Sequence, residues 1–124
     1  MKLLIADDEA GVRSLVRMTL DSEDYEIIEA ANGHDALAAA REHRPDLVLL
    51  DVNMPGPSGF DVCRMLKQDP QTADMTIVML TAQAQESDLE AGLSSGADGY
   101  FTKPFSPIAL LRKVEDVLAG KEEE

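Results

Sequence analysis

The stretch Asp46-Leu47-Val48-Leu49-Leu50-Asp51 decides the fold of this chain. Four successive apolar residues between two aspartates fit a strand that is buried on both faces. Such strands are typical of parallel sheets that helices cover on both sides. We therefore predict a strand over residues 46–50, with Asp51 just beyond its carboxyl end.

The same alternation of a short apolar run and an amphipathic segment repeats along the chain. Further strands are predicted over residues 2–6, 26–30, 75–80 and 99–102. Five strand–helix units predict an α/β domain with a parallel sheet and helices on both faces. The helices are predicted where apolar or small residues recur at i, i+3, i+4 and i+7: Val12, Leu15, Val16 and Thr19; Gly33, Ala36, Leu37 and Ala40; Gly59, Val62, Cys63 and Leu66; Leu89, Gly92, Leu93 and Gly96; Leu110, Leu111, Val114, Val117 and Leu118.

Cap residues divide the chain at the same places. Ser58 and Ser106 are predicted N-caps, because a serine hydroxyl can accept a hydrogen bond from a first-turn amide. Gly120 is placed to end the last helix. We predict one domain over residues 1–119, with residues 120–124 an acidic tail or the start of a linker.

The composition narrows the class of protein. The 124 residues carry 24 acidic and 11 basic side chains, a formal charge of −13. Such a surface disfavours direct binding to nucleic acid or to anionic lipid, which both need basic groups. The single cysteine, Cys63, excludes an intrachain disulfide and is predicted to be a small buried hydrophobe. The sequence shows neither a signal peptide nor an apolar run of membrane length, so we expect a cytoplasmic protein.

Polar residues gather at the carboxyl ends of four predicted strands. Asp7 and Asp8 follow the first strand, Asp51 the third, Thr81 the fourth and Lys103 the fifth. In a parallel sheet these ends lie on one edge, where ligands of such folds bind. Solvated loops also carry polar residues, and this explanation would suffice for any one of the acids alone. It weakens once a hydroxyl and an ammonium occupy the equivalent positions on other strands.

These groups together suit phosphoryl transfer. Crowded carboxylates repel one another unless a cation joins them, and magnesium suits hard oxygen ligands better than zinc or copper does. Lys103 needs a partner to point inward, and Asp51 would supply one. The lysine and the Thr81 hydroxyl could hold phosphoryl oxygens while the aspartate attacks in line.

The motifs, taken in order, resemble the receiver domain of two-component response regulators over essentially the full length. This resemblance implies a flavodoxin-like doubly wound (βα)5 fold, with a five-stranded parallel sheet in the order 2-1-3-4-5. The matching segments are Asp7-Asp8-Glu9, Leu49-Leu50-Asp51-Val52-Asn53-Met54-Pro55, Gly59, Leu80-Thr81-Ala82, Gly96-Ala97-Asp98-Gly99-Tyr100 and Lys103-Pro104-Phe105.

The resemblance implies that Asp51 is the phosphoacceptor. It would receive a phosphoryl group from the phosphohistidine of a sensor histidine kinase or a histidine phosphotransfer protein. Mg²⁺, with Mn²⁺ as an alternative, would be held by the Asp8 and Asp51 carboxylates, by Asp7 through a water, and by the backbone carbonyl of Asn53. By the same resemblance the domain is no metabolic enzyme and catalyses only its own phosphorylation and dephosphorylation.

The resemblance also implies the groups that read the phosphoryl group. Lys103, the Thr81 hydroxyl and the backbone N–H of Ala82 would contact it, and the peptide bond before Pro104 would be cis. Thr81 and Tyr100 match the family's switch pair, which alters the surface of the fourth helix, fifth strand and fifth helix. That surface would bind a downstream protein or an output domain, or a second copy as a homodimer, with no direct contact to nucleic acid or membrane.

Two other functions fit part of the pattern. One is a degenerate receiver that serves only as a dimerisation or docking module. That function would require one of the reactive residues named above to be missing, and none is. The other is an aspartate-nucleophile phosphatase related to haloacid dehalogenases. Those enzymes place a general-acid aspartate two residues after the nucleophile, where this chain has Asn53.

Overall fold

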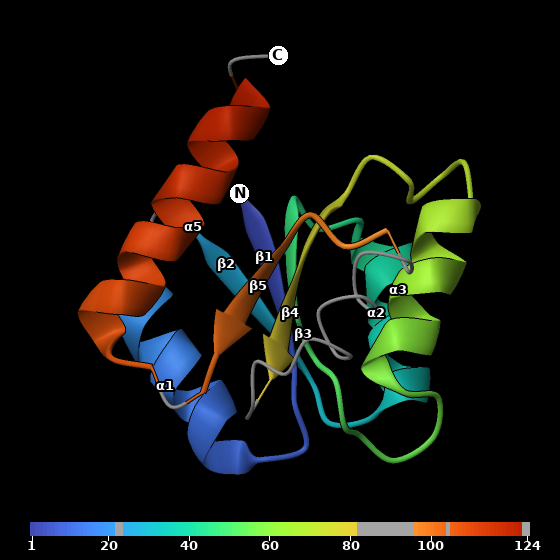
Figure 1. The fold of residues 1–124 in the computed structure, drawn as a ribbon, viewed down its shortest axis with the longest axis horizontal. Coiled ribbons are helices and arrows are strands. Elements are labelled where there is room, and N and C mark those ends of the chain that lie inside the picture. The colour runs from blue at the N-terminus through green and yellow to red at the C-terminus, as the bar shows by residue number, and fades with distance from the viewer. Residues whose placement is uncertain (22–23, 82–95, 104, 123–124) are drawn as a thin grey trace.

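The computed structural model of the protein describes residues 1–21, 24–81, 96–103 and 105–122. Five parallel strands form one sheet in the order β2-β1-β3-β4-β5 (Figure 1). The predicted α/β class and strand order are therefore confirmed. The strands are β1 Lys2–Ala6, β2 Glu26–Ala30, β3 Leu47–Asp51, β4 Thr76–Thr81 and β5 Gly99–Thr102.

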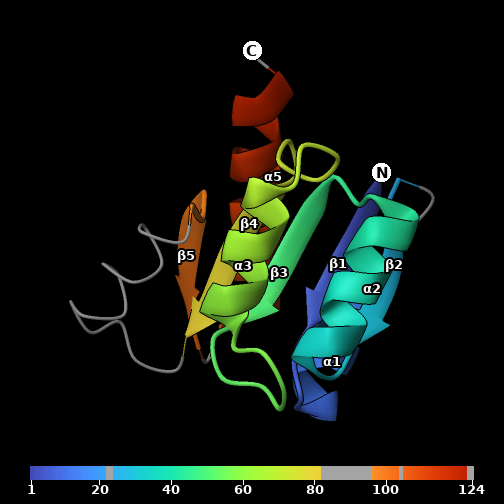
Figure 2. The same ribbon diagram turned by 90° about the vertical axis from the view of Figure 1, so that its right-hand side faces the viewer.

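The described helices cover both faces of the sheet, as predicted. In Figure 2, α2 and α3 lie in front of the sheet, and α1 and α5 lie behind it. The predicted helical stripe at Leu89, Gly92 and Leu93 lies outside the described residues. The helices that the structure describes are α1 Ala10–Leu20, α2 Gly33–His43, α3 Gly59–Gln68 and α5 Pro107–Glu122.

The core consists of two apolar layers, one on each side of the sheet. Alternate residues of a strand point to opposite faces, so Val48 and Leu50 pack towards α2 and α3. Leu47 and Leu49 pack on the other side, towards α1 and α5. All five residues of β3 are buried, as expected for a central strand. Cys63 is fully buried in the α3 layer, which confirms its predicted role as a core residue.

Two boundaries differ from the sequence prediction. β3 and β4 each begin and end one residue later than predicted, so Asp51 and Thr81 are the last residues of their strands and not the first residues of loops. The sheet ladder continues there, because the Val52 amide donates to the Leu80 carbonyl and the Lys103 amide to the Thr81 carbonyl. Both side chains are therefore held by regular backbone.

The helix starts follow the predicted caps, whereas the end of the last helix does not. The Ser58 hydroxyl accepts from the Asp61 amide at 3.2 Å, and the Ser106 hydroxyl accepts from the Ala109 amide at 3.1 Å. Helix α5 runs through Gly120 to Glu122, so the predicted end at Gly120 is wrong. A glycine inside a helix costs only about 1 kcal/mol relative to alanine, which does not force the helix to stop.

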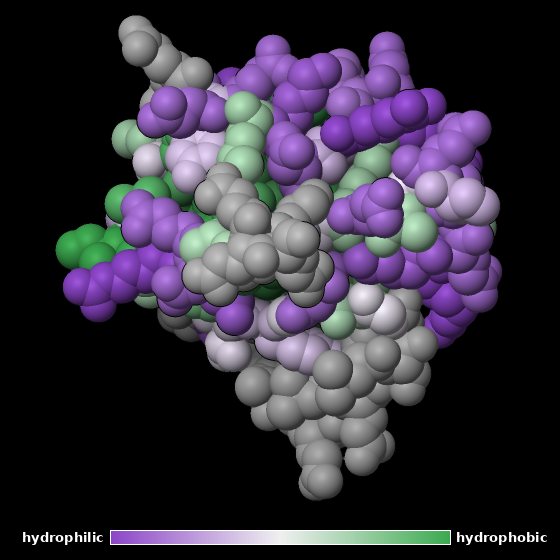
Figure 3. All heavy atoms as spheres, turned by 90° about the horizontal axis from the view of Figure 1, so that it is seen from above, coloured by the Kyte–Doolittle hydropathy of each residue, from purple (hydrophilic) through white to green (hydrophobic). Residues whose placement is uncertain are grey.

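The face of the molecule seen in Figure 3 is mainly hydrophilic, with hydrophobic atoms gathered on the side where α1 and α5 lie. Met18 on α1 is 84 % exposed and Ile108 on α5 is 66 % exposed. Among the described helices, none combines the length and the apolarity that crossing a bilayer requires.

Candidate functional site

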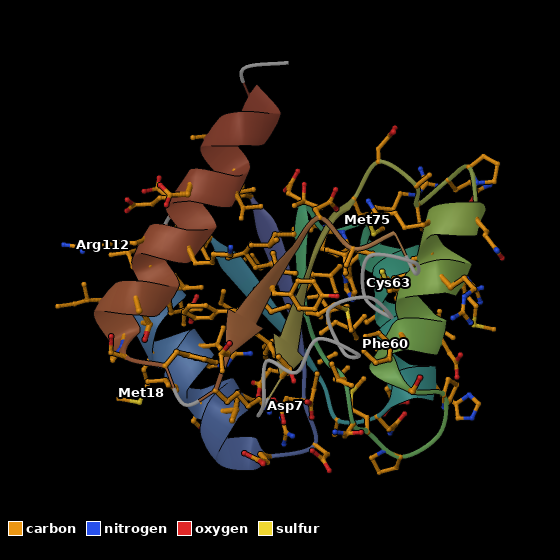
Figure 4. The ribbon with its side chains drawn as sticks, in the orientation of Figure 1. Asp7, Met18, Phe60, Cys63, Met75 and Arg112 are labelled. Atoms are coloured by element: carbon orange, nitrogen blue, oxygen red, sulfur yellow. The ribbon has the colours of Figure 1, made fainter. Side chains whose placement is uncertain are left out.

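The candidate site lies at the edge of the sheet where β1, β3, β4 and β5 end. Asp7 directly follows β1, and its amide donates to the Ala30 carbonyl at the end of β2 at 3.0 Å. In the parallel register Asp51 is level with Leu80, and Thr81 with Thr102. Figure 4 shows Asp7 at this edge, beside the tips of the strand arrows.

Three carboxylates meet at this edge. Asp7, Asp8 and Asp51 each offer one oxygen, and these oxygens lie within 4.8 Å of one another. Asp7 is fully buried, Asp51 is 6 % exposed, and Asp8 faces solvent. The structure thus brings together the three acids that the sequence placed at the ends of two separate strands.

Lys103 supplies the positive charge of the site. Its Nζ lies 2.6 Å from Asp7 Oδ2 and 3.4 Å from Asp51 Oδ1. The predicted partner is Asp51, but the closer contact is to Asp7, which is the more deeply buried acid. Burial alone would lower the pKa of Lys103, yet the nearby Asp7 and Asp51 carboxylates outweigh it and raise the pKa. The lysine is therefore charged at neutral pH.

The segment that carries Lys103 is fixed by its neighbours. The Lys103 amide donates to the Thr81 carbonyl at 2.7 Å, which ties the residue to the end of β4. Phe101 and Phe105, on either side of it in the sequence, stack with ring centroids 4.7 Å apart. The ammonium is thus directed at the carboxylates by backbone pairing and by aromatic packing.

Asp51 is an unusual carboxylate electrostatically. Burial and the nearby Asp7 charge raise its pKa from 3.8 to about 6, although Lys103 and the Asn53 amide pull the pKa in the opposite direction. The Asn53 amide donates to Asp51 Oδ1 at 3.4 Å. At neutral pH Asp51 is therefore ionised but poorly stabilised, as suits a nucleophile.

The donor set fits a divalent cation. The Lys103 ammonium pairs with two of the three carboxylates, the buried Asp7 and Asp51, so the three acids and this lysine together carry a net negative charge. Asp7 Oδ1 accepts from the Glu9 amide at 2.9 Å, whereas Asp7 Oδ2 has no aligned hydrogen-bond donor among the described residues, only the ion pair with Lys103. Hard carboxylate oxygens of this kind suit Mg²⁺ or Mn²⁺.

Gly59 allows the next helix to start against the site. A Cβ at Gly59 would lie 2.1 Å from the Asp51 carbonyl oxygen, so a side chain cannot be accommodated without moving the backbone. The Gly59 amide donates to the Val52 carbonyl at 2.9 Å. This contact brings the start of α3 onto the end of β3 and closes the loop that contains Asn53.

Thr81 and Tyr100 occupy neighbouring strands. Thr81 is 4 % exposed at the end of β4. Tyr100 is half-buried and packs against the core layer of α2 and α3, level with Met79. Ala82 and Pro104, which complete the predicted set, lie outside the described residues.

One residue near the site was absent from the sequence prediction. Arg13, in the first turns of α1, donates from Nη1 to the Asp7 backbone carbonyl at 2.7 Å. An arginine near the start of a helix is too common to be singled out, and only the tertiary structure shows which carbonyl it reaches. A groove of about 240 Å³ also opens beside Lys103, lined by Glu9, Val12 and Phe105 among others.

Comparison with known proteins supports the interpretation that this geometry suggests. The sequence profile of the response regulator receiver domain matches residues 3–115. The chain is 45 % identical over 116 residues to the phosphate regulon transcriptional regulatory protein PhoB of Pseudomonas aeruginosa, covering 94 % of this chain and 51 % of PhoB. It is 42 % identical over 123 residues to the DNA-binding response regulator MtrA of Mycobacterium tuberculosis, covering 99 % of this chain and 53 % of MtrA.

A solved structure agrees with the fold along nearly the whole chain. The chemotaxis protein CheY4 of Vibrio cholerae superposes with a TM-score of 0.88 at 36 % identity, covering 94 % of this chain and 97 % of CheY4. The chain spans about half the length of the curated relatives that it matches. With matching motifs, strand order and acidic edge, the chain belongs to the response regulator receiver domain family, the phosphoacceptor signalling domains of two-component systems.

Proposed function

We propose that Asp51 is the residue of this receiver domain that accepts the phosphoryl group. The observation that carries the proposal is the position of Asp51, which ends β3 facing the Lys103 ammonium with two further carboxylates beside it. The donor would be a phosphohistidine of a sensor histidine kinase or of a histidine phosphotransfer protein. A carboxylate oxygen attacks phosphorus, the phosphorus–nitrogen bond breaks, and its electron pair returns to the imidazole.

Asp7, Asp8 and Asp51 would together hold Mg²⁺, or Mn²⁺ in its place, with Asn53 as a further ligand. When bound, the ion supplies positive charge that offsets both the crowded carboxylates and the phosphoryl oxygens. The raised pKa of Asp51, about 6, leaves it ionised at neutral pH and so able to attack. Because the nearby positive charge only partly neutralises the Asp51 carboxylate, the binding of a cation beside it is favoured.

Lys103 and Thr81 would hold the transferred group. Lys103 contacts both Asp7 and Asp51 in the unmodified protein. Its ammonium would therefore be close enough to bind the phosphoryl oxygens once Asp51 carries them. Thr81 ends the strand next to β3 and can donate its hydroxyl to the same oxygens. Chemistry of this kind modifies the domain itself, and we propose no turnover of a metabolite.

Tyr100 would carry the signal to the surface. It lies half-buried on β5, next to β4 and its Thr81, and packs on the core layer of α2 and α3. A shift of Thr81 towards a phosphoryl group would change the space open to the ring. The surface around β5 and α5 would then bind a downstream protein, an output domain or a second copy of the domain.

The curated relatives bear on the partners of this surface. PhoB is a transcriptional regulatory protein and MtrA a DNA-binding response regulator, and this chain matches about half of each. We propose that the receiver domain acts on such an output through protein contacts, and that its own acidic surface does not touch nucleic acid. If the domain takes up no phosphoryl group, it is instead a degenerate receiver that serves only for docking.

The test is phosphoryl uptake from acetyl phosphate with MgCl2, measured by intact mass. We expect one acid-labile phosphoryl group on the wild-type protein and none on Asp51→Asn. Asp98→Asn is the matched control, since Asp98 is also an aspartate paired with a lysine but lies at the other edge of the sheet. Undiminished uptake by Asp51→Asn would contradict the proposal, and steady release of phosphate from p-nitrophenyl phosphate would favour a phosphatase instead.

A further inference from the structure

Arg13 on α1 holds the acidic turn of the site, which consists of Asp7, Asp8 and Glu9. The side chain of Arg13 is 20 % exposed, and its Nη1 donates to the Asp7 backbone carbonyl at 2.7 Å. That carbonyl belongs to the peptide that joins Asp7 to Asp8, so the bond fixes the plane of the peptide between two of the three carboxylates. The Glu9 amide, which donates to Asp7 Oδ1, holds the other side of the turn.

Glu29 on β2 fixes the guanidinium of Arg13. Glu29 Oε1 lies 3.3 Å from Arg13 Nε, and Oε2 lies 2.8 Å from Arg17 Nε, one helical turn further along α1. The next residue, Ala30, accepts the Asp7 amide at 3.0 Å. The end of β2 therefore holds the turn twice, once directly and once through Arg13.

We infer that Arg13 is a positioning residue for the metal site, with Glu29 as its support. Repulsion among three carboxylates favours opening of the turn that carries two of them. The bond from Arg13 to the Asp7 carbonyl opposes that opening, because it restrains the peptide from which the Asp8 side chain departs. The inference rests on the proposed function, since it concerns the ion that Asp7, Asp8 and Asp51 would hold.

Lysine cannot replace arginine in this role. The planar guanidinium serves the Asp7 carbonyl through Nη1 and the Glu29 carboxylate through Nε in one fixed geometry. A lysine ammonium keeps the positive charge but has no rigid fork to serve both acceptors. Arg13→Lys therefore removes the positioning while leaving the charge of the region unchanged.

Arg17 provides a matched control on the same helix. It shares the Glu29 carboxylate with Arg13, and its Nη2 donates to the Ile27 carbonyl at 3.2 Å and not to the acidic turn. A loss of stability from weaker pairing with Glu29 would affect both lysine variants. Of these two arginines, Arg13 donates to the backbone of the acidic turn, whereas Arg17 donates to the backbone of β2.

The test is calorimetric titration of the full chain with MgCl2 alone, together with the melting temperature of each protein. We expect Arg13→Lys to weaken Mg²⁺ binding about tenfold, as the loss of an outer-shell partner of a metal site does. Arg17→Lys should weaken binding less than about twofold, since it leaves the contact with Asp7 in place. Hydrogen exchange of the Glu9 amide should quicken in Arg13→Lys and stay unchanged in Arg17→Lys.

A second variant keeps the inference testable if Arg13→Lys folds poorly. Glu29→Gln releases the guanidinium without altering Arg13, and it should weaken Mg²⁺ binding in the same direction. If the wild-type protein binds Mg²⁺ and the two lysine variants bind it equally, the inference is overturned and the proposed function stands. If the wild-type protein binds no Mg²⁺, the proposed metal site itself is wrong and the inference falls with it.

Discussion

Two lysine–aspartate pairs lie at opposite edges of the sheet and differ in how their charges are satisfied. Lys67 Nζ lies 2.9 Å from Asp98 Oδ2, at the edge where β4 and β5 begin. Lys103 contacts Asp7 and Asp51 at the edge where β1 and β3 end. The residue types are the same, but the surroundings assign them different roles.

The Lys67–Asp98 pair is balanced. Lys67 also donates to the Met75 carbonyl at 2.6 Å, and the Asp98 carboxylate accepts from the Ile77 amide at 2.8 Å. One ammonium faces one carboxylate, and backbone groups take up the remaining hydrogen bonds. A pair of this kind joins α3 to the starts of β4 and β5 and has no need of a ligand.

The Lys103 cluster is unbalanced. Oxygens of Asp7, Asp8 and Asp51 lie within 4.8 Å of one another, while the Lys103 ammonium pairs with Asp7 and Asp51. The pKa of Asp51 is raised to about 6 by burial and by the neighbouring Asp7 charge. Repulsion among the carboxylates therefore destabilises this edge, and a bound cation or the removal of one negative charge would relieve that repulsion. Unsatisfied charge, and not the presence of an ion pair, separates the edge that we propose to be functional from the structural one.

The largest expected effect comes from breaking the balanced pair. Lys67→Met should lower the free energy of unfolding by about 2–3 kcal/mol, because it leaves the Asp98 carboxylate and the Met75 carbonyl without their cation. Urea denaturation followed by circular dichroism measures this change. Asp98→Asn, which keeps an acceptor for the Ile77 amide, should cost less; a loss below about 0.5 kcal/mol in Lys67→Met would contradict a structural role for the pair.

The unbalanced edge should respond in the opposite direction. Asp51→Asn should raise the free energy of unfolding of the metal-free protein by about 1–2 kcal/mol at pH 7.5, because it removes a poorly stabilised charge. The pKa of Asp51 is higher in the folded protein than its ordinary value, so between these two pKa values the folded state binds more protons than the unfolded state. The free energy of unfolding of the wild-type protein therefore falls by about the same amount as pH rises from 3.8 to about 6. Below that range both states hold the proton, and the advantage of the variant should vanish. A variant that is equally stabilised at pH 3.5 would show that the charge is not the cause.

Magnesium should stabilise the unbalanced edge and leave the balanced one unaffected. At ten times the dissociation constant, binding adds about 1.4 kcal/mol, which for a domain of this size raises the melting temperature by about 5 °C. The rise should be present in Lys67→Met, although that protein melts lower, and much reduced in Asp8→Asn. Differential scanning fluorimetry with and without MgCl2 measures it, and a melting temperature indifferent to millimolar MgCl2 would count against a metal site.

Most of the site could be predicted because its residues have a fixed relation to the strands. Asp51 and Thr81 end apolar runs, and in a parallel sheet such ends share one edge. The identity of the closest partner of Lys103 could not be predicted, because it depends on which acid is more deeply buried. The continuation of α5 through Gly120 was likewise hidden, since a glycine weakens a helix without deciding where it ends.

The sequence by itself determined the succession of strands and helices along the chain, the two buried faces of the sheet and the gathering of acidic, hydroxyl and amino groups at its edge. These follow from the spacing of apolar residues and from residue types at strand ends, which are local properties of the chain. Only the tertiary structure decided that Lys103 lies closer to Asp7 than to Asp51, that Lys67 and Asp98 are satisfied, and that Arg13 reaches the Asp7 carbonyl. Electrostatic energies depend on distance and burial in three dimensions, and neither quantity can be read from positions along the chain.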